Sequence, residues 1–211
     1  MGIFRLFSLF VVAITMFFLV CCSENGTEAE AYVPGPFDYG MLVDSRDGKN
    51  YKTIQIGEQN WMAENLNYEY NEGSGKSYCY EDNMDYCTAF GRLYNWTAAK
   101  LVCPEGWHLP NSKEWDTLWT TVGGINTAGY MLKATSMNGI DKYGFSILSS
   151  GIRYHLGDYK YVDSETSFWI APRIGSDEIN HCDFGNGRKE VGLSHDYSRL
   201  DEYRSVRCIK D

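Results

Sequence analysis

The chain has 211 residues, of which 22% are charged, and its formal net charge at pH 7 is −9. This length suits one globular domain preceded by a leader. The acidic balance argues against a nucleic-acid partner, because binding a phosphate backbone needs a basic footprint. Aromatic residues make up 15% of the chain and glycines number 21, a composition that loop-rich extracellular domains share with sugar-binding proteins.

The first 22 residues have the pattern of an export signal. Arg5 lies in a short basic segment, an apolar run covers residues 6–20, and Cys21 and Cys22 follow it directly. The Leu-Val-Cys-Cys sequence resembles a bacterial lipobox, which predicts acylation of Cys22, with Cys21 as the alternative. A cleaved secretion signal and an uncleaved anchor are the other interpretations, although the apolar run is short of the ~20 residues of a spanning helix. We therefore expect an exported protein that is lipid-anchored in the bacterial cell envelope, at the outer membrane or cell surface.

Residues 23–40 predict a flexible tether between the lipid membrane and the folded part. They are rich in Glu, Gly, Thr and Ala and contain Pro34-Gly35-Pro36 near their end. They show no helical or strand periodicity. The remaining residues, 41–211, are expected to form the single folded domain.

Residues 43–66 predict a β-hairpin. Asp47-Gly48 is a turn signal, and Ile54 and Ile56 alternate with polar residues, as in a strand with one buried face. Gly57 then begins a second turn.

A helix is predicted after Pro110. Asn111 and Glu114 have the spacing of a capping box, and the sequence continues with apolar residues at i, i+3, i+4 and i+7. These residues are Trp115, Leu118, Trp119 and Val122. Gly123-Gly124 predicts the end of this helix, because glycine adopts a left-handed conformation without a Cβ clash. A second helix is predicted from about Thr88 to Leu101, with Gly91 as the local objection.

An exported protein should pair most of its cysteines. Five follow the leader: Cys79, Cys87, Cys103, Cys182 and Cys208. Proximity favours a Cys79–Cys87 bridge around an acidic loop, and Cys103 would then join Cys208. Cys182 is expected to be a free cysteine. A reactive thiol beside His181 is the alternative, but neighbours on a strand point to opposite faces, which is unsuitable for a nucleophile and its base.

Several short motifs identify a family. They are Gly91-Arg-Leu-Tyr-Asn-Trp96, Cys103-Pro-Glu-Gly-Trp-His-Leu-Pro110, Tyr143-Gly-Phe-Ser146, Phe168-Trp169 and Ser205-Val-Arg-Cys208. Together with residues 43–66 they closely resemble the Fibrobacter succinogenes major paralogous domain over about residues 41–211. That domain is similar to the C-type-lectin-like fold, which includes formylglycine-generating enzymes. The resemblance implies an α+β domain with two short helices, a small twisted antiparallel sheet, long irregular loops and termini that lie close together.

The sequence shows no pattern for catalysis, a cofactor or a metal. A formylglycine-generating enzyme would need a closely spaced C-terminal cysteine pair, whereas Cys182 and Cys208 are far apart, so we expect no enzyme. The four histidines do not have zinc-site spacing: His108, His155, His181 and His195.

Calcium-dependent lectin chemistry is also not indicated. The Glu-Pro-Asn and Trp-Asn-Asp triplets are absent, and Trp169 is expected to be a core strand residue, with a sugar platform as the alternative. Asp44, Asp47 and Gly48 do not complete a calcium loop. The acidic residues Glu81, Asp82 and Asp85 predict a solvated loop, with a weak cation site as the alternative.

The stretch from Gly151 to Tyr161 is the best candidate recognition surface, because tyrosines offer contact area at a small entropic cost. The candidate ligand-binding residues are Arg153, Tyr154, His155, Asp158, Tyr159 and Tyr161. The alternative is a tyrosine-rich hairpin whose rings cover the sheet. We expect a non-catalytic binding or adhesion module for a polysaccharide or another surface protein. A structural envelope component is the second interpretation, and an unrecognised enzyme is the third.

Overall fold

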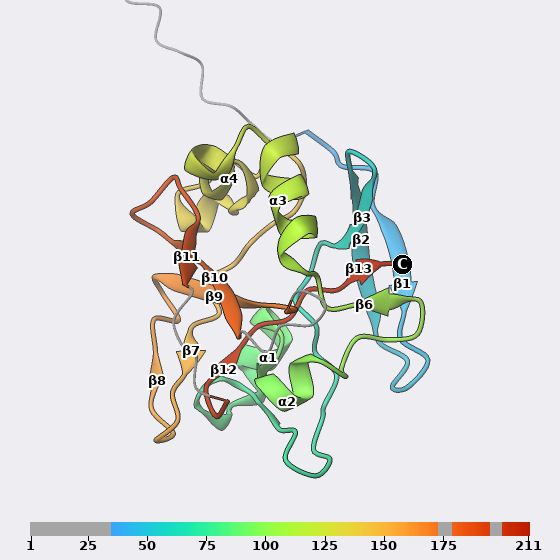
Figure 1. The fold of residues 1–211 in the computed structure, drawn as a ribbon, viewed down its shortest axis with the longest axis vertical. Coiled ribbons are helices and arrows are strands. Elements are labelled where there is room, and N and C mark those ends of the chain that lie inside the picture. Colours follow the sequence, from blue (N-terminus) through green and yellow to red (C-terminus); the bar gives the residue numbers. More distant parts are fainter. Residues whose placement is uncertain (1–34, 173–178, 195–199) are drawn as a thin grey trace, which may run out of the picture. The chain divides into compact units, whose positions relative to one another are not determined.

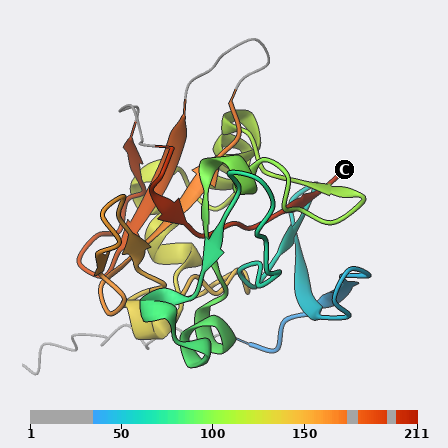
Figure 2. The same cartoon turned by 90° about the horizontal axis from the view of Figure 1, so that it is seen from below.

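The computed structural model describes residues 35–172, 179–194 and 200–211. Residues 1–22, with Cys22, and most of the expected tether lie outside the described residues, as does His195. The described residues form an α+β domain with three antiparallel sheets and four α-helices (Figures 1 and 2). Across these three ranges, no helix has the length and apolar character needed to span a membrane.

The first sheet contains the predicted hairpin and the C-terminus. Its strands, in spatial order, are β1 (Gly40–Val43), β2 (Asn50–Ile56), β3 (Gln59–Met62), β13 (Ile209–Lys210) and β6 (Trp107–His108). The predicted turns are confirmed, with Gly48 at φ 73° and Gly57 at φ 59°. Ile54 and Ile56 are buried, as their alternation predicted. The first and last strands of the domain, β1 and β13, lie in this sheet, as expected if the two ends of the domain are close together.

Two further sheets are formed mainly by the second half of the domain. One has the order β4 (Ser77–Tyr78), β5 (Leu93–Asn95), β12 (Tyr203–Arg204), β7 (Ile152–Arg153) and β8 (Tyr159–Lys160). The other has the order β11 (Gly192–Ser194), β10 (Asn180–Gly185) and β9 (Glu165–Ile170). A parallel bridge between Phe168 and Ser205 connects β9 to the segment after β12.

The helix predicted after Pro110 is confirmed as α3 (Ser112–Thr121). The Asn111 side chain accepts from the backbone N–H of Glu114, and the Glu114 carboxylate accepts from that of Asn111 at 2.8 Å. Gly123, at φ 112°, ends the helix. The chain then begins α4 (Ile125–Leu132), which the sequence analysis did not predict. In Figure 1, α3 lies between the first sheet and α4.

The helix predicted over residues 88–101 is wrong. The chain forms instead the 3₁₀ turn η1 (Tyr80–Asp82), α1 (Met84–Phe90), strand β5 and the short α2 (Trp96–Ala99). Gly91, at φ 77°, ends α1, and a Cβ there would lie 2.8 Å from the carbonyl oxygen of Leu66. The next residues pair with β12 and β4, and the Asn95 side chain then caps α2 by accepting from the N–H of Ala98. Pairing with distant strands therefore overrides the helical pattern.

The implied count of two helices and one small sheet is likewise too low for the described residues. A further 3₁₀ turn, η2 (Thr135–Met137), follows α4. The extra helices are short, and each is buried on one side against a sheet or a loop. For example, Gly129 of α4 packs against the backbone carbonyl of Glu190.

Tryptophans organise the two main clusters of the core. Trp115 of α3 is fully buried, with its ring centroid 4.9 Å from that of Trp61 and 5.8 Å from that of Phe168. Trp169 is fully buried in the second cluster, and its indole N–H donates to the carbonyl oxygen of Tyr94 at 2.7 Å. The interpretation of Trp169 as a core strand residue is confirmed.

Both expected disulfides are present, which confirms the pairing. The Cα atoms are 5.0 Å apart in Cys79–Cys87 and 5.8 Å apart in Cys103–Cys208. Cys182 is a free cysteine in β10 and is completely buried. Its burial raises the pKa of the thiol well above 9.0, so the thiol is protonated at neutral pH.

Candidate functional site: a tyrosine groove and an arginine pocket

The disulfide loop and the candidate recognition loop meet in space, although about seventy residues separate them in the sequence. Together they line a wide, shallow hollow of about 560 Å³, which we call the tyrosine groove. Its lining residues are Tyr80, Glu81, Tyr86, Tyr159, Lys160, Tyr161, Val162, Asp163 and Ser164.

Ring contacts and one hydrogen bond hold the two loops together. The ring of Tyr80 lies 5.1 Å from the ring of Tyr159 and 5.1 Å from that of Tyr86, between centroids. The hydroxyl of Tyr159 donates to a carboxylate oxygen of Asp82 at 2.9 Å. Burial and this carboxylate raise the pKa of Tyr159 to about 12, so the phenol keeps its proton.

Three of the six described non-glycine residues with positive φ lie in the two loops at the groove. Glu81, Asp82 and Tyr161 have φ values of 52°, 55° and 70°, a left-handed region that non-glycine residues rarely adopt. The Cys79–Cys87 bridge and the Asn83 cap of α1 enclose the first two of these residues. Such strain persists only where the surroundings fix it, and it is concentrated at functional sites.

The six candidate ligand-binding residues are separated by the fold. Tyr159 and Tyr161 line the groove, and Tyr161 is 45% exposed. Arg153 instead packs inward, with its guanidinium 4.2 Å from the ring centre of Tyr78 and 4.6 Å from that of Tyr203. This contact fits the alternative interpretation, in which rings cover the sheet. Tyr154, His155 and Asp158 lie in or beside the β7–β8 turn and do not line the groove.

Tyr80, Tyr86 and Asp163 line the groove and were not predicted from the sequence to do so. The first two lie between Cys79 and Cys87, in the loop that the cysteine spacing had identified. The tyrosines in this acidic loop could have indicated a second part of the recognition surface. Only the long-range pairing of β5, β12 and β7 brings that loop beside residues 159–164.

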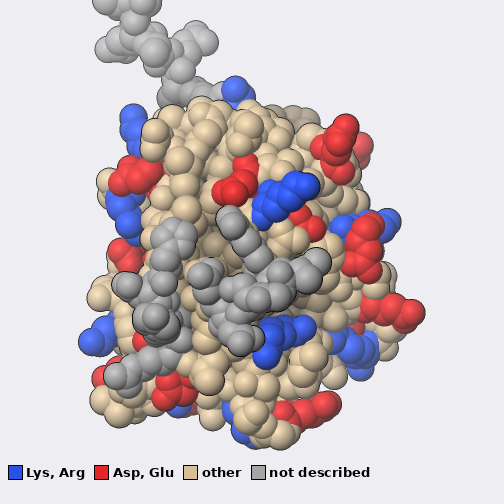
Figure 3. Space-filling view, viewed as in Figure 1, with Lys and Arg blue, Asp and Glu red and all other residues tan. Residues whose placement is uncertain are grey.

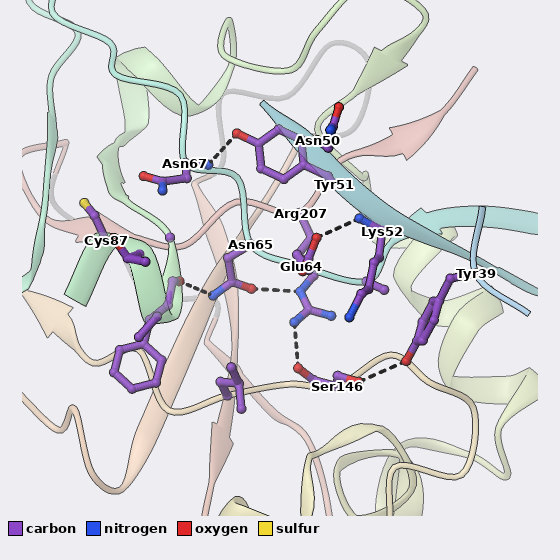
Figure 4. A pocket seen from close by; sticks show the side chains of 16 residues that line it. Tyr39, Asn50, Tyr51, Lys52, Glu64, Asn65, Asn67, Cys87, Ser146 and Arg207 are labelled. Carbon is purple, nitrogen blue, oxygen red and sulfur yellow. Dashed lines mark hydrogen bonds between the residues drawn. The ribbon is translucent and has the colours of Figure 1, made fainter. Parts of the chain in front are cut away.

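A second hollow, the arginine pocket, is lined in part by the end of α1 (Figure 4). It has a volume of about 310 Å³ and is lined by residues of β2, the segment after β3, the end of α1 and the loop at Ser146, with Arg207 among them. The Arg207 side chain is buried. Its Nε donates to the side-chain oxygen of Asn65 at 2.8 Å, and its terminal nitrogens donate to the carbonyl oxygens of Phe145 and Ser146.

Within the described residues, the Arg207 guanidinium forms no salt bridge. It donates instead to three neutral oxygen atoms. Its burial lowers its pKa to about 9, against the opposing influence of the carboxylates of Asp141 and Glu64. Asp141 is occupied by the backbone N–H and hydroxyl of Ser146. One oxygen of Glu64 accepts from the backbone N–H of Lys52 at 2.7 Å. The pocket therefore contains a buried cation that its surroundings compensate only in part.

Among the described residues, no cluster of three or more His, Cys, Asp or Glu side chains could hold a metal ion. On the face drawn in Figure 3, acidic and basic side chains of the described residues are interspersed, without a continuous patch of either sign.

No match to this chain was found among curated proteins or among solved structures. The model of the Fibrobacter succinogenes major domain matches residues 54–210, which include both disulfides, the tyrosine groove and the part of the arginine pocket that follows β2. The chain belongs to the Fibrobacter succinogenes major domain family.

Proposed function

We propose that this protein is a non-catalytic binding module that holds a neutral polysaccharide in the tyrosine groove. The observation that carries the proposal is the convergence of four tyrosines and two acidic residues, Glu81 and Asp163, on one open hollow. Tyrosine faces pack against the C–H faces of sugar rings, and carboxylate oxygens accept hydrogen bonds from sugar hydroxyls. A wide, shallow hollow can accommodate part of a polymer chain.

The charges at the groove favour a neutral polymer. Glu81, Asp82 and Asp163 surround it, against the single ammonium of Lys160. An acidic polysaccharide would meet like charges there, and a nucleic acid would meet them more strongly.

The cysteine and histidine chemistry supports a function without catalysis. The Cys182 thiol is buried and protonated, and Cys208 is in a disulfide. Both ring nitrogens of His108 are occupied by carboxylates, at 2.8 Å from Glu114 and 2.6 Å from Asp211.

We also propose the C-type-lectin-like fold for the domain, with export and lipid anchoring in the cell envelope through Cys22. The shared sheet of first and last strands and the two disulfides support this fold. Intact mass of membrane-extracted protein should show a lipid-bearing N-terminus, and Cys22→Ala should release or stall the protein. A Cys22→Ala variant that stays in the membrane at normal size contradicts the anchor.

Binding of the detergent-solubilised full chain to immobilised neutral and acidic polysaccharides tests the groove. Tyr161→Ala and Tyr86→Ala should each weaken retention on a neutral polymer about tenfold, since loss of one aromatic stacking contact costs about 1 kcal/mol or more. The control is Tyr130→Ala, a partly buried tyrosine on α4 away from the groove. A chelator should leave retention and melting temperature unchanged. Equal loss in all three variants, or binding only to an envelope protein, contradicts the proposal.

A further inference from the structure

The arginine pocket has features of a ligand site, and none of its lining residues belongs to the tyrosine groove. A guanidinium has five N–H donors, and the described acceptors of Arg207 take three of them. The remaining two belong to the terminal nitrogens, because Nε carries one hydrogen and donates it to Asn65. These two donors have no hydrogen-bond acceptor among the described residues, and Arg207 lines the pocket.

Residues of β2 and of the segment after β3 also line the pocket, and Asn65 of that segment accepts from the Nε of Arg207. Lys52 is an exposed residue on β2, and its side chain extends towards the same part of the pocket as the guanidinium (Figure 4). Among the lining residues, Lys52 and Arg207 are cations and Glu64 is a carboxylate, and Asp141, which binds Ser146, also acts on Arg207. Because these carboxylates offset part of the cationic charge, the pocket favours a monoanion over a phosphate dianion.

The other lining groups are mostly neutral and polar, with hydroxyls and amides on several sides. The hydroxyl of Tyr39 lies 3.4 Å from that of Ser146, and the hydroxyl of Tyr51 accepts from the backbone N–H of Asn67 at 3.1 Å. The side-chain oxygen of Asn67 is buried and has no hydrogen-bond partner in the structure. Each of these groups suits the hydroxyls of a sugar ring.

The backbone at Ser146 is held in a strained conformation at the pocket. Ser146 has φ 55°, and the Asp141 carboxylate fixes it by accepting from its N–H at 2.8 Å. The carbonyl oxygen of Ser146 then accepts from Arg207 at 3.0 Å. The donors of the pocket are thus oriented before any ligand enters it.

From this arrangement we propose that the arginine pocket binds one sugar-acid unit, with its carboxylate between Lys52 and Arg207 and its hydroxyls on the neutral polar groups. A volume of about 310 Å³ is at the lower end of small-molecule sites and suits a single ring. This site is separate from the tyrosine groove, so it holds or fails independently of the proposed polysaccharide binding.

Calorimetric titration of the full chain in detergent with sodium D-glucuronate tests the site. D-Glucose, sodium acetate, glycylglycine and inorganic phosphate serve as comparison probes. Glucuronate should bind at least about tenfold more tightly than each of them, because it alone combines one carboxylate with a ring of hydroxyls. Glucose, acetate or glycylglycine binding as tightly as glucuronate overturns the sugar-acid assignment, and phosphate binding more tightly overturns the monoanion assignment.

Variants locate the binding in the pocket. Lys52→Met should weaken glucuronate binding about tenfold, because it removes one charge-assisted contact from an exposed position without disturbing the core. Lys113→Met, on the exposed side of α3, is the matched control and should have no effect. Arg207→Lys should also weaken glucuronate binding. The melting curve of this variant checks that it is folded. Unchanged binding in Lys52→Met, or equal loss in Tyr161→Ala of the groove, overturns the proposal.

Discussion

The two disulfides close loops of very different length, which allows their stabilising mechanism to be tested within one protein. The sequence separation is 8 residues for Cys79–Cys87 and 105 residues for Cys103–Cys208. In the chain-entropy model, closing these loops in the unfolded state contributes about 2.5 and about 4.7 kcal/mol, respectively. Replacing both cysteines of a pair by alanine should therefore cost about 2 kcal/mol more for the long loop than for the short one.

The comparison works because packing terms largely cancel between the two pairs. Each pair places at least one cysteine in the core, with Cys87 1% exposed and Cys208 completely buried, so similar apolar volume is removed in both double variants. Urea unfolding under non-reducing conditions measures both free energies of unfolding. Equal losses, or a larger loss for the short loop, would refute the entropic reasoning and show that native packing around the sulfurs determines the effect.

Two ionic contacts give further predictions. Arg46→Met should lower the free energy of unfolding, measured in urea titrations, by about 3 kcal/mol. The substitution removes the guanidinium that binds the fully buried Asp44 carboxylate at 2.6 and 2.8 Å. A loss below about 1 kcal/mol would contradict this prediction. Burial lowers the pKa of His108, but the hydrogen bonds to Asp211 and Glu114 exceed that effect and raise it above 6.5. Its stabilising contribution is thus full below pH 6.5 and disappears as pH rises through the higher folded-state pKa. The difference in stability between wild type and His108→Gln should shrink over that range, and a constant difference would contradict it.

Local patterns in the sequence predicted the elements that depend on local chemistry. The helix α3 has its capping box, apolar stripe and terminating glycine within fourteen residues, so its position needs no tertiary information. The β2–β3 hairpin is similar, since alternation and the Gly57 turn define it. The cysteine pairing was also predicted: the short spacing favoured Cys79–Cys87, and of the two remaining candidates Cys208 rather than Cys182 was assigned to Cys103.

The errors arose where distant strands decide the local structure. Residues 93–95 have helical spacing, yet they form β5 because Tyr94 and Asn95 pair with β12 more than a hundred residues later. The helix α4 was missed because Gly123 and Gly124 indicate an end, while Gly124 is also the residue before the next helix. The recognition loop was chosen for its tyrosines, but the packing of Arg153 under Tyr78 could be known only from the β7–β12 pairing.

The short helix α1 connects the two proposed sites. Tyr86 lines the tyrosine groove, and Phe90, one turn later, lines the arginine pocket, with 6.1 Å between their ring centroids. Cys87 lies between them in the sequence and fixes this helix to Cys79. Because the same disulfide encloses the strained residues of the groove and fixes the wall of the pocket, its loss should loosen both hollows at once. Neither Cys103 nor Cys208 lines a hollow, but Cys208 directly follows Arg207 of the arginine pocket, so loss of this bridge should lower global stability and leave the local geometry of the tyrosine groove intact.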